Sequence, residues 1–183
     1  MSIFKGAGTA LVTPMNADGS VNFPKMKELI EFQIANGIDA LIICGTTGEA
    51  TTISDEDQIE CVRFAKEVAA GRCPIIAGAG SNDTAHCIEL AVACEKAGAD
   101  AISSVPPFYW NFSADAIYQY YKDLSESVSI PLVIYNVQLA GIMNRQLLTR
   151  IAQLPNVKGM KYTEERKFSP LSTMVLSSTE NRM

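Results

Sequence analysis

The stretch Ala40-Leu41-Ile42-Ile43-Cys44-Gly45-Thr46-Thr47-Gly48-Glu49 decides the fold class of this chain. Its first half is apolar at every position, which is typical of a parallel strand covered on both faces. Its second half offers two hydroxyls and several backbone N–H groups between two glycines. Such a loop suits a carboxylate or a phosphate, because glycines let the backbone close on an anion. An ordinary turn is an equally good interpretation of the loop alone.

The same strand-and-helix unit recurs along the chain on both sides of this stretch. Two similar segments, Gly37-Ile38-Asp39-Ala40 and Gly98-Ala99-Asp100-Ala101, each lie where a predicted helix passes into a predicted strand, which indicates a repeated unit. The alternation predicts a mainly parallel α/β fold with six strands and five helices between them. The predicted strands are Thr9–Thr13, Ala40–Cys44, Pro74–Ala77, Ala99–Val105, Ile130–Val137 and Val157–Tyr162. The predicted helices are Pro24–Asn36, 54–71 with Ser54 as its cap, Asp83–Ala97, Ser113–Ser127 and Asn144–Leu154.

Six strand-helix units fit two architectures. An open, doubly wound sheet would be complete at 183 residues, whereas a (β/α)8 barrel needs eight strands and about 250 residues. The count by itself favours the open sheet and, with it, a nucleotide-binding protein. However, Gly78-Ala79-Gly80 lacks the third glycine of a dinucleotide fingerprint, and no Walker pattern is present.

Composition excludes several classes of protein. Hydrophobic residues make up 48% of the chain, which excludes disorder, and the net charge is −5, which disfavours nucleic acid and anionic membranes as partners. No apolar run approaches the roughly 18 residues that a membrane span needs. The first eleven residues lack the pattern of a signal peptide. We therefore expect one cytoplasmic domain.

The metal-binding residue types are sparse. Five cysteines without a CxxC pair are typical of buried free thiols rather than of a disulfide framework or a zinc site. The one histidine, His86, cannot build a multi-histidine site, and a structural or surface role is expected for it. We predict no metal and no cofactor.

Two reactive side chains end neighbouring strands. Lys161 closes the strand that begins at Val157, and alternation places Val157, Gly159 and Lys161 on one face of it. An amine at such a position can attack carbonyl groups, although most lysines at strand ends are simply solvated. Tyr135 ends the preceding strand and can carry protons, although a lone tyrosine there more often closes the core.

In combination, these residues resemble a known family. The segments Gly45-Thr46-Thr47-Gly48-Glu49, Tyr135-Asn136 and Gly159-Met160-Lys161, in this order and spacing, resemble the dihydrodipicolinate synthase / N-acetylneuraminate lyase family. The opening Thr13-Pro14-Met15 and the segment Pro107-Phe108-Tyr109 also fit. The family consists of class I aldolases on a (β/α)8 barrel, and the resemblance extends from about Phe4 to Thr163.

The resemblance implies a role for each matched residue. Lys161 matches the lysine that forms a Schiff base with pyruvate. Thr46 and Thr47 match the hydroxyl pair that holds the pyruvate carboxylate. Tyr135 matches the general acid/base, and Tyr109 matches a tyrosine that supports the proton relay from a neighbouring subunit of a homo-oligomer.

The choice of reaction rests on the segment after Tyr135. Dihydrodipicolinate synthases continue with a proline and an arginine that grips the carboxylate of the second substrate, aspartate semialdehyde. This chain instead continues Val137-Gln138-Leu139-Ala140-Gly141, with apparently one residue fewer. The segment, together with Lys161-Tyr162-Thr163, is closer to the lyase branch. The prediction is therefore cleavage of a sugar keto acid to pyruvate and an aldehyde, with the synthase reaction as the alternative.

The remainder of the family barrel is not recognisable in this sequence. We expect residues 1–163 to form about six of eight barrel strands and residues 164–183 to be a divergent tail rich in serine and threonine. An unclosed barrel exposes strand edges and apolar faces. A third interpretation is therefore an inactive, truncated or frameshifted family member that keeps the lysine and loses the scaffold around it.

Overall fold

A computed structural model describes residues 5–163 and 173–175 of the chain. The strands it describes are β1 (Gly8–Ala10), β2 (Ala40–Ile43), β3 (Ile75–Gly78), β4 (Ala101–Ser104), β5 (Leu132–Val137), β6 (Val157–Thr163) and β7 (Thr173–Val175). The α-helices are α1 (Phe23–Ala35), α2 (Asp55–Ala69), α3 (Thr84–Lys96), α4 (Ala114–Ser127) and α5 (Arg145–Ile151). Two single 3₁₀ turns, η1 (Ala50–Thr52) and η2 (Gln138–Ala140), follow β2 and β5.

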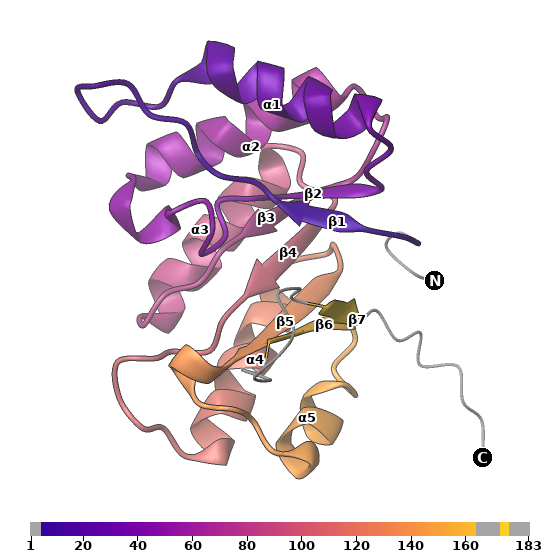
Figure 1. Ribbon diagram of the computed structural model, residues 1–183. Helices are drawn as coiled ribbons and strands as arrows, with labels where there is room; N and C mark the ends of the chain where they lie inside the picture. The colour runs from indigo at the N-terminus through magenta and orange to yellow at the C-terminus, as the bar shows by residue number, and fades with distance from the viewer. Residues whose placement is uncertain (1–4, 164–172, 176–183) are drawn as a thin grey trace.

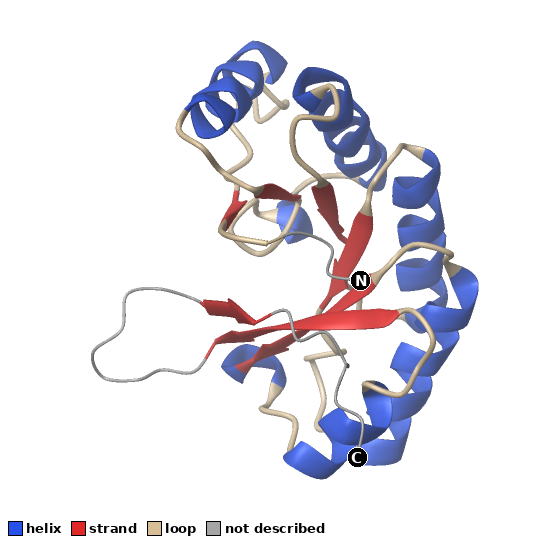
Figure 2. Cartoon of the chain, turned by 90° about the vertical axis from the view of Figure 1, so that its right-hand side faces the viewer, coloured by secondary structure: helices blue, strands red, loops and turns tan. Residues whose placement is uncertain are grey.

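The strands form one curled sheet in strictly sequential order, from β1 to β7 (Figure 1). Pairing from β1 to β6 is parallel throughout, and β7 joins β6 antiparallel. Figure 2 shows the helices in an arc along the outer side of the curl. A doubly wound sheet reverses its strand order at a switch point. This chain has no such reversal among the described strands, so the incomplete barrel is confirmed and the open-sheet alternative is wrong.

Each α-helix begins at a side chain that caps it. Asn22, Ser54, Asp83, Ser113 and Asn144 each accept a hydrogen bond from a backbone N–H in the first turn of α1 to α5, respectively. Such caps supply acceptors for N–H groups that have no partner inside the helix, and each contributes about 1 kcal/mol. The predicted starts of the helices are therefore confirmed to within a residue or two.

The core lies in two layers separated by the sheet. The larger layer packs the outer face of the strands against the helices and includes Leu41, Ile75, Ile102 and Leu124, all fully buried. The smaller layer lies on the inner face of the curl and consists of Ala40, Ile42, Ile76 and Ala101, with Ala10 packed against it. Side chains alternate between the two layers along β2, β3 and β4, so both faces of these strands are apolar, as the continuous apolar runs predict.

The first strand is shorter than the predicted Thr9–Thr13. Pairing of β1 with β2 ends at Ala10↔Ile42, followed by one further bond from Leu11 N to Ile42 O. Cys44, directly after β2, has a φ of 53° and cannot extend the ladder. Thr13 instead turns its hydroxyl to Gly48 O, 2.7 Å away.

Strand β6 departs from the predicted alternation at its start. The register passes from Leu132↔Val157 directly to Val133↔Gly159, so Lys158 is an extra residue, as in a β-bulge. Val157 therefore belongs to the outer layer together with Met160, while Lys161 faces inward. The prediction that Val157 shares a face with Lys161 is wrong, because the bulge shifts the alternation by one residue.

Most of the predicted tail, residues 164–183, lies outside the described residues. The exception is β7, whose residues Thr173, Met174 and Val175 pair with Tyr162, Lys161 and Met160. The sequence analysis did not predict this strand, and the divergent character of the tail stays a prediction. No helix in the described part of the chain is long and apolar enough to cross a membrane.

The larger layer of the core leads us to expect different effects of two substitutions on the free energy of unfolding. Leu124→Ala removes a fully buried side chain, and we expect it to lower the free energy of unfolding by about 2–5 kcal/mol. Phe32→Ala removes a side chain that is 61% exposed, and we expect a change within about 0.5 kcal/mol. Urea denaturation followed by circular dichroism measures both, and equal effects would contradict this assignment of the core.

Candidate active site

A cavity of about 220 Å³ lies at the carboxyl ends of the parallel strands, on the inner side of the curl. Residues from β1 to β6 and the loops that follow them line it. Its polar side chains are Thr46, Thr51, Ser103, Tyr135 and Lys161. Lys161 is the only charged side chain among its described lining residues, so an anion entering the cavity meets one cation and several hydroxyls.

The amine of Lys161 lies against the ring of Tyr135. The two residues are directly opposite each other in the β5–β6 register, and Nζ lies 4.2 Å from the centroid of the ring. This distance is within the range of a cation–π interaction, worth about 0.5–2 kcal/mol. The pairing of the two strands therefore brings a nucleophile and a phenolic hydroxyl into one cavity.

The loop after β2 carries backbone strain at both ends. Cys44 and Glu49 have φ values of 53° and 56°, in the left-handed region that side chains with a Cβ rarely adopt. Each such residue costs on the order of 1–3 kcal/mol and persists only where its surroundings hold it. Thr13 holds the middle of the loop through Gly48 O, and Glu49 N donates to Thr46 O. The strain turns the loop so that Gly45, Thr46, Ala50 and Thr51 reach the cavity.

Gly78 permits the closest backbone approach in the site. A Cβ at this position would lie 2.1 Å from Cys44 O and 2.9 Å from Gly45 N. Both atoms belong to the backbone, which cannot swing aside as a side chain does. The absence of a side chain at the end of β3 therefore sets how closely the strained loop packs on the sheet.

The two predicted threonines have different positions. Thr46 lines the cavity, while Thr47 is exposed and is not among the lining residues. The joint role of Thr46 and Thr47 stays a prediction. Thr51 and Ser103, which the sequence did not single out, also line the cavity. Alternation along the predicted strand Ala99–Val105 could have identified Ser103, because it places Ala101 and Ser103 on one face.

Tyr109 lies outside this cavity. Its side chain is 73% exposed and stacks edge-on against Trp110, with ring centroids 5.1 Å apart. The amide oxygen of Asn82 holds the loop, because it accepts hydrogen bonds from Phe108 N and Tyr109 N. Of this loop, Phe108 lines the cavity. The role of Tyr109 in the site of a neighbouring subunit stays a prediction.

All five cysteines are buried and free, as predicted. The Cys87 thiol donates to Ala79 O and contacts the hydroxyl of Tyr120, 2.9 Å away. Burial raises the pKa of Cys87, and it raises the pKa of Cys94 to about 12. A hydrogen bond to Cys61 and burial raise the pKa of Cys44. Cys44, Cys87 and Cys94 therefore stay protonated thiols at neutral pH.

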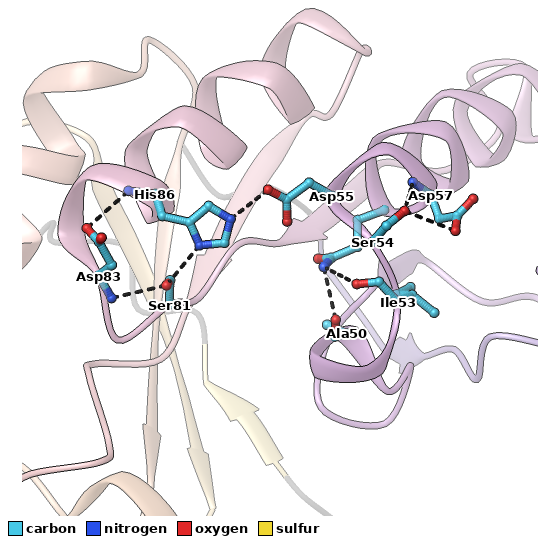
Figure 3. A network of polar contacts seen from close by, with 9 residues as sticks. Ala50, Ile53, Ser54, Asp55, Asp57, Ser81, Asp83 and His86 are labelled. Atoms are coloured by element: carbon cyan, nitrogen blue, oxygen red, sulfur yellow. Dashed lines mark hydrogen bonds and ion pairs between the residues drawn. The ribbon is translucent and has the colours of Figure 1, made fainter.

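His86 has a structural role, as expected. Its Nε2 lies 2.6 Å from Asp55 Oδ2 and its Nδ1 lies 3.0 Å from Ser81 Oγ. Figure 3 shows the imidazole between these two groups, linking the start of α2 to the loop before α3. Among the described residues, no cluster of three or more His, Cys, Asp or Glu side chains could hold a metal ion.

Comparison with known proteins identifies the family. The sequence model of the Dihydrodipicolinate synthetase family matches residues 3–178. The chain belongs to this family. A 4-hydroxy-tetrahydrodipicolinate synthase from Acetivibrio thermocellus is 45% identical over 161 residues, which are 87% of this chain and 55% of that relative. The chain thus spans about half the length of the curated relatives it matches.

Solved structures agree in both sequence and fold. The chloride-inhibited dihydrodipicolinate synthase of Acinetobacter baumannii complexed with pyruvate is 39% identical, with a TM-score of 0.83 over 85% of this chain and 54% of that one. An N-acetylneuraminate lyase from Mycoplasma synoviae is 34% identical, with a TM-score of 0.81 over 90% of this chain and 57% of that one. Both branches named by the sequence resemblance therefore share this half-barrel.

The close contact between Gly78 and the Cys44–Gly45 backbone leads to a prediction about stability. Gly78→Ala forces the Cys44–Gly45 peptide away from the sheet, and we expect a loss of about 1–3 kcal/mol in the free energy of unfolding. In Gly45→Ala, the control, the new Cβ meets Ile42 Cγ2 at an ordinary 3.5 Å, and we expect a change within about 1 kcal/mol. Urea denaturation of both variants provides the measurement, and an unaffected Gly78→Ala would refute the close approach.

Proposed function

We propose that the chain forms a Schiff base between Lys161 and pyruvate, the shared first step of its family. The observation that carries this proposal is the position of the Lys161 amine on the ring of Tyr135, inside a cavity where Lys161 is the only charged side chain among the described lining residues. The pyruvate complex of the Acinetobacter baumannii relative supports the choice of substrate.

The proposed chemistry uses three groups of the cavity. The uncharged amine of Lys161 adds to the keto carbon of pyruvate, and loss of water gives the imine. The imine draws electrons from the neighbouring methyl carbon, which then loses a proton and becomes a carbon nucleophile. The hydroxyl of Tyr135 carries protons to and from these centres. The hydroxyls of Thr46 and Thr51 donate to the pyruvate carboxylate.

For the second step, we propose condensation with aspartate semialdehyde, the synthase reaction. Curated relatives support it, because eight of them, with 39–45% identity, all carry the name 4-hydroxy-tetrahydrodipicolinate synthase. The preference for the lyase rested on residues 137–141 and 161–163, and the names of these relatives favour the alternative over it.

The lyase reaction remains the second candidate because of one observation. Val137 and Ala140, which line the cavity after Tyr135, carry no charge, and Lys161 is consumed by the imine. A second carboxylate then has no oppositely charged partner among the described lining residues, and burying an unpaired carboxylate is costly. Cleavage of a sugar keto acid releases an uncharged aldehyde and avoids this cost.

The first test is borohydride trapping. We expect the purified chain, incubated with pyruvate and borohydride, to gain the mass of one reduced pyruvyl group on Lys161. Lys161→Arg abolishes this adduct, because a guanidinium stays protonated and does not form the imine. The matched control is Lys158→Arg on the same strand, since Lys158 is exposed and its amine binds Pro155 O. Peptide mass spectrometry locates the adduct.

An absent adduct in the unaltered chain would refute the proposal and establish the third interpretation, an inactive family member. An adduct in Lys161→Arg at wild-type yield would assign the chemistry to another amine.

The second test separates the two reactions. With aspartate semialdehyde and pyruvate, we expect the chain to consume both aldehyde and pyruvate, and with N-acetylneuraminate we expect no release of pyruvate. A coupled assay for pyruvate reads out both reactions. Release of pyruvate from N-acetylneuraminate, with no consumption of aspartate semialdehyde, would instead establish the lyase.

A further inference from the structure

We propose that Gln58 is a positioning residue that holds the strained loop from Cys44 to Ile53 in the conformation that faces the cavity. The link to pyruvate rests on the proposed function, whereas the effect on the loop does not. Gln58 lies in the first turns of α2, is 6% exposed and does not line the cavity. It therefore acts through the loop and not on a bound molecule.

The amide of Gln58 ties down the end of the loop. Its Nε2 donates to Ala50 O at 2.9 Å and to Ile53 O at 3.3 Å. Figure 3 shows Ala50 and Ile53, each at the end of a dashed line, beside the start of α2. Ala50 belongs to the turn η1 and lines the cavity itself. One side chain thus binds a carbonyl group at the first residue of the turn and another at the residue that follows it, and so sets the distance of the turn from the helix.

The backbone of the same residue holds the start of the loop. The Cys44 sulfur contacts Gln58 O at 3.9 Å. Cys44 is the first of the two non-glycine residues in the left-handed region, and Glu49, the second, directly precedes the turn that Gln58 binds. Gln58 therefore contacts Cys44 at the start of the strained segment and Ala50, the residue that follows Glu49, at its end.

Helix α2 fixes Gln58 in turn. The helix begins at Ser54, whose hydroxyl accepts from Asp57 N, and Gln58 N donates to Ser54 O. His86 holds Asp55 in the same first turn. The loop is therefore anchored to the rigid N-terminal end of α2. Strained φ values persist only where the surrounding structure holds them in this way.

The test compares two variants of Gln58 with a matched control. Gln58→Met keeps the length and unbranched shape of the side chain without any donor, and Gln58→Glu puts a carboxylate against two carbonyl oxygens. Gln153→Met is the control, because Gln153 is exposed in the segment after α5. Hydrogen exchange read by mass spectrometry reports on residues 45–53, with residues 61–69 of α2 as the internal reference.

We expect exchange over residues 45–53 to be roughly tenfold faster in both variants of Gln58, and unchanged in the control and in the reference segment. In borohydride trapping, we expect the half-saturating pyruvate concentration to rise roughly tenfold in both variants, with the yield at saturation within about twofold, because Lys161 itself is untouched.

Wild-type exchange over residues 45–53 in both variants would overturn the proposal. It is also overturned if the trapped yield at saturation falls while the half-saturating concentration does not change, since that is the result of a general loss of folded protein. An unaltered chain that forms no adduct refutes the proposed function instead, and the exchange measurement then still decides the role of Gln58.

Discussion

Parallel, sequential pairing of β1 to β6 is the constraint on which the remainder of this structure depends. The carboxyl ends of parallel strands lie at the same edge of a sheet, so the loops that follow them all lie at this edge, the rim of the cavity. The pairing also sets which side chains face each other across the ladder, and the opposition of Tyr135 and Lys161 is a direct result. The cavity, the loop after β2 and the reactive amine are all consequences of this one hydrogen-bonding pattern.

The rim is built from irregular backbone as much as from reactive side chains. Cys44 and Glu49 hold left-handed conformations, and Gly78 leaves room for the peptide between Cys44 and Gly45. Strain of this kind persists only when several contacts oppose its release. Thr13 supplies one of these contacts from the segment after β1, and Gln58 supplies others from α2. Residues that touch no substrate thereby set the geometry of the site.

The sequence predicts regular structure well where the pattern is local. Caps and apolar runs locate five of the six predicted strands and four of the five helices to within a residue or two, while α5 ends three residues before its predicted end. The predictions fail where distant residues interfere: Thr13 leaves the first strand to bond Gly48, and the extra residue Lys158 moves Val157 to the outer layer. Similarly, the sequence does not distinguish the two adjacent threonines, whereas in the structure Thr46 lines the cavity and Thr47 does not.

The sequence by itself determined the repeated strand-helix unit, the family, and the presence of a lysine and a tyrosine on adjacent strands, each two residues before its strand ends. These features rest on local periodicity and on residue identity, which a single chain displays directly. Only the tertiary structure decided which hydroxyls share the cavity with Lys161, that Tyr109 lies outside it, and that Gln58 holds the loop. These depend on contacts between segments far apart in sequence, where the bulge in β6 and the close approach at Gly78 set the geometry.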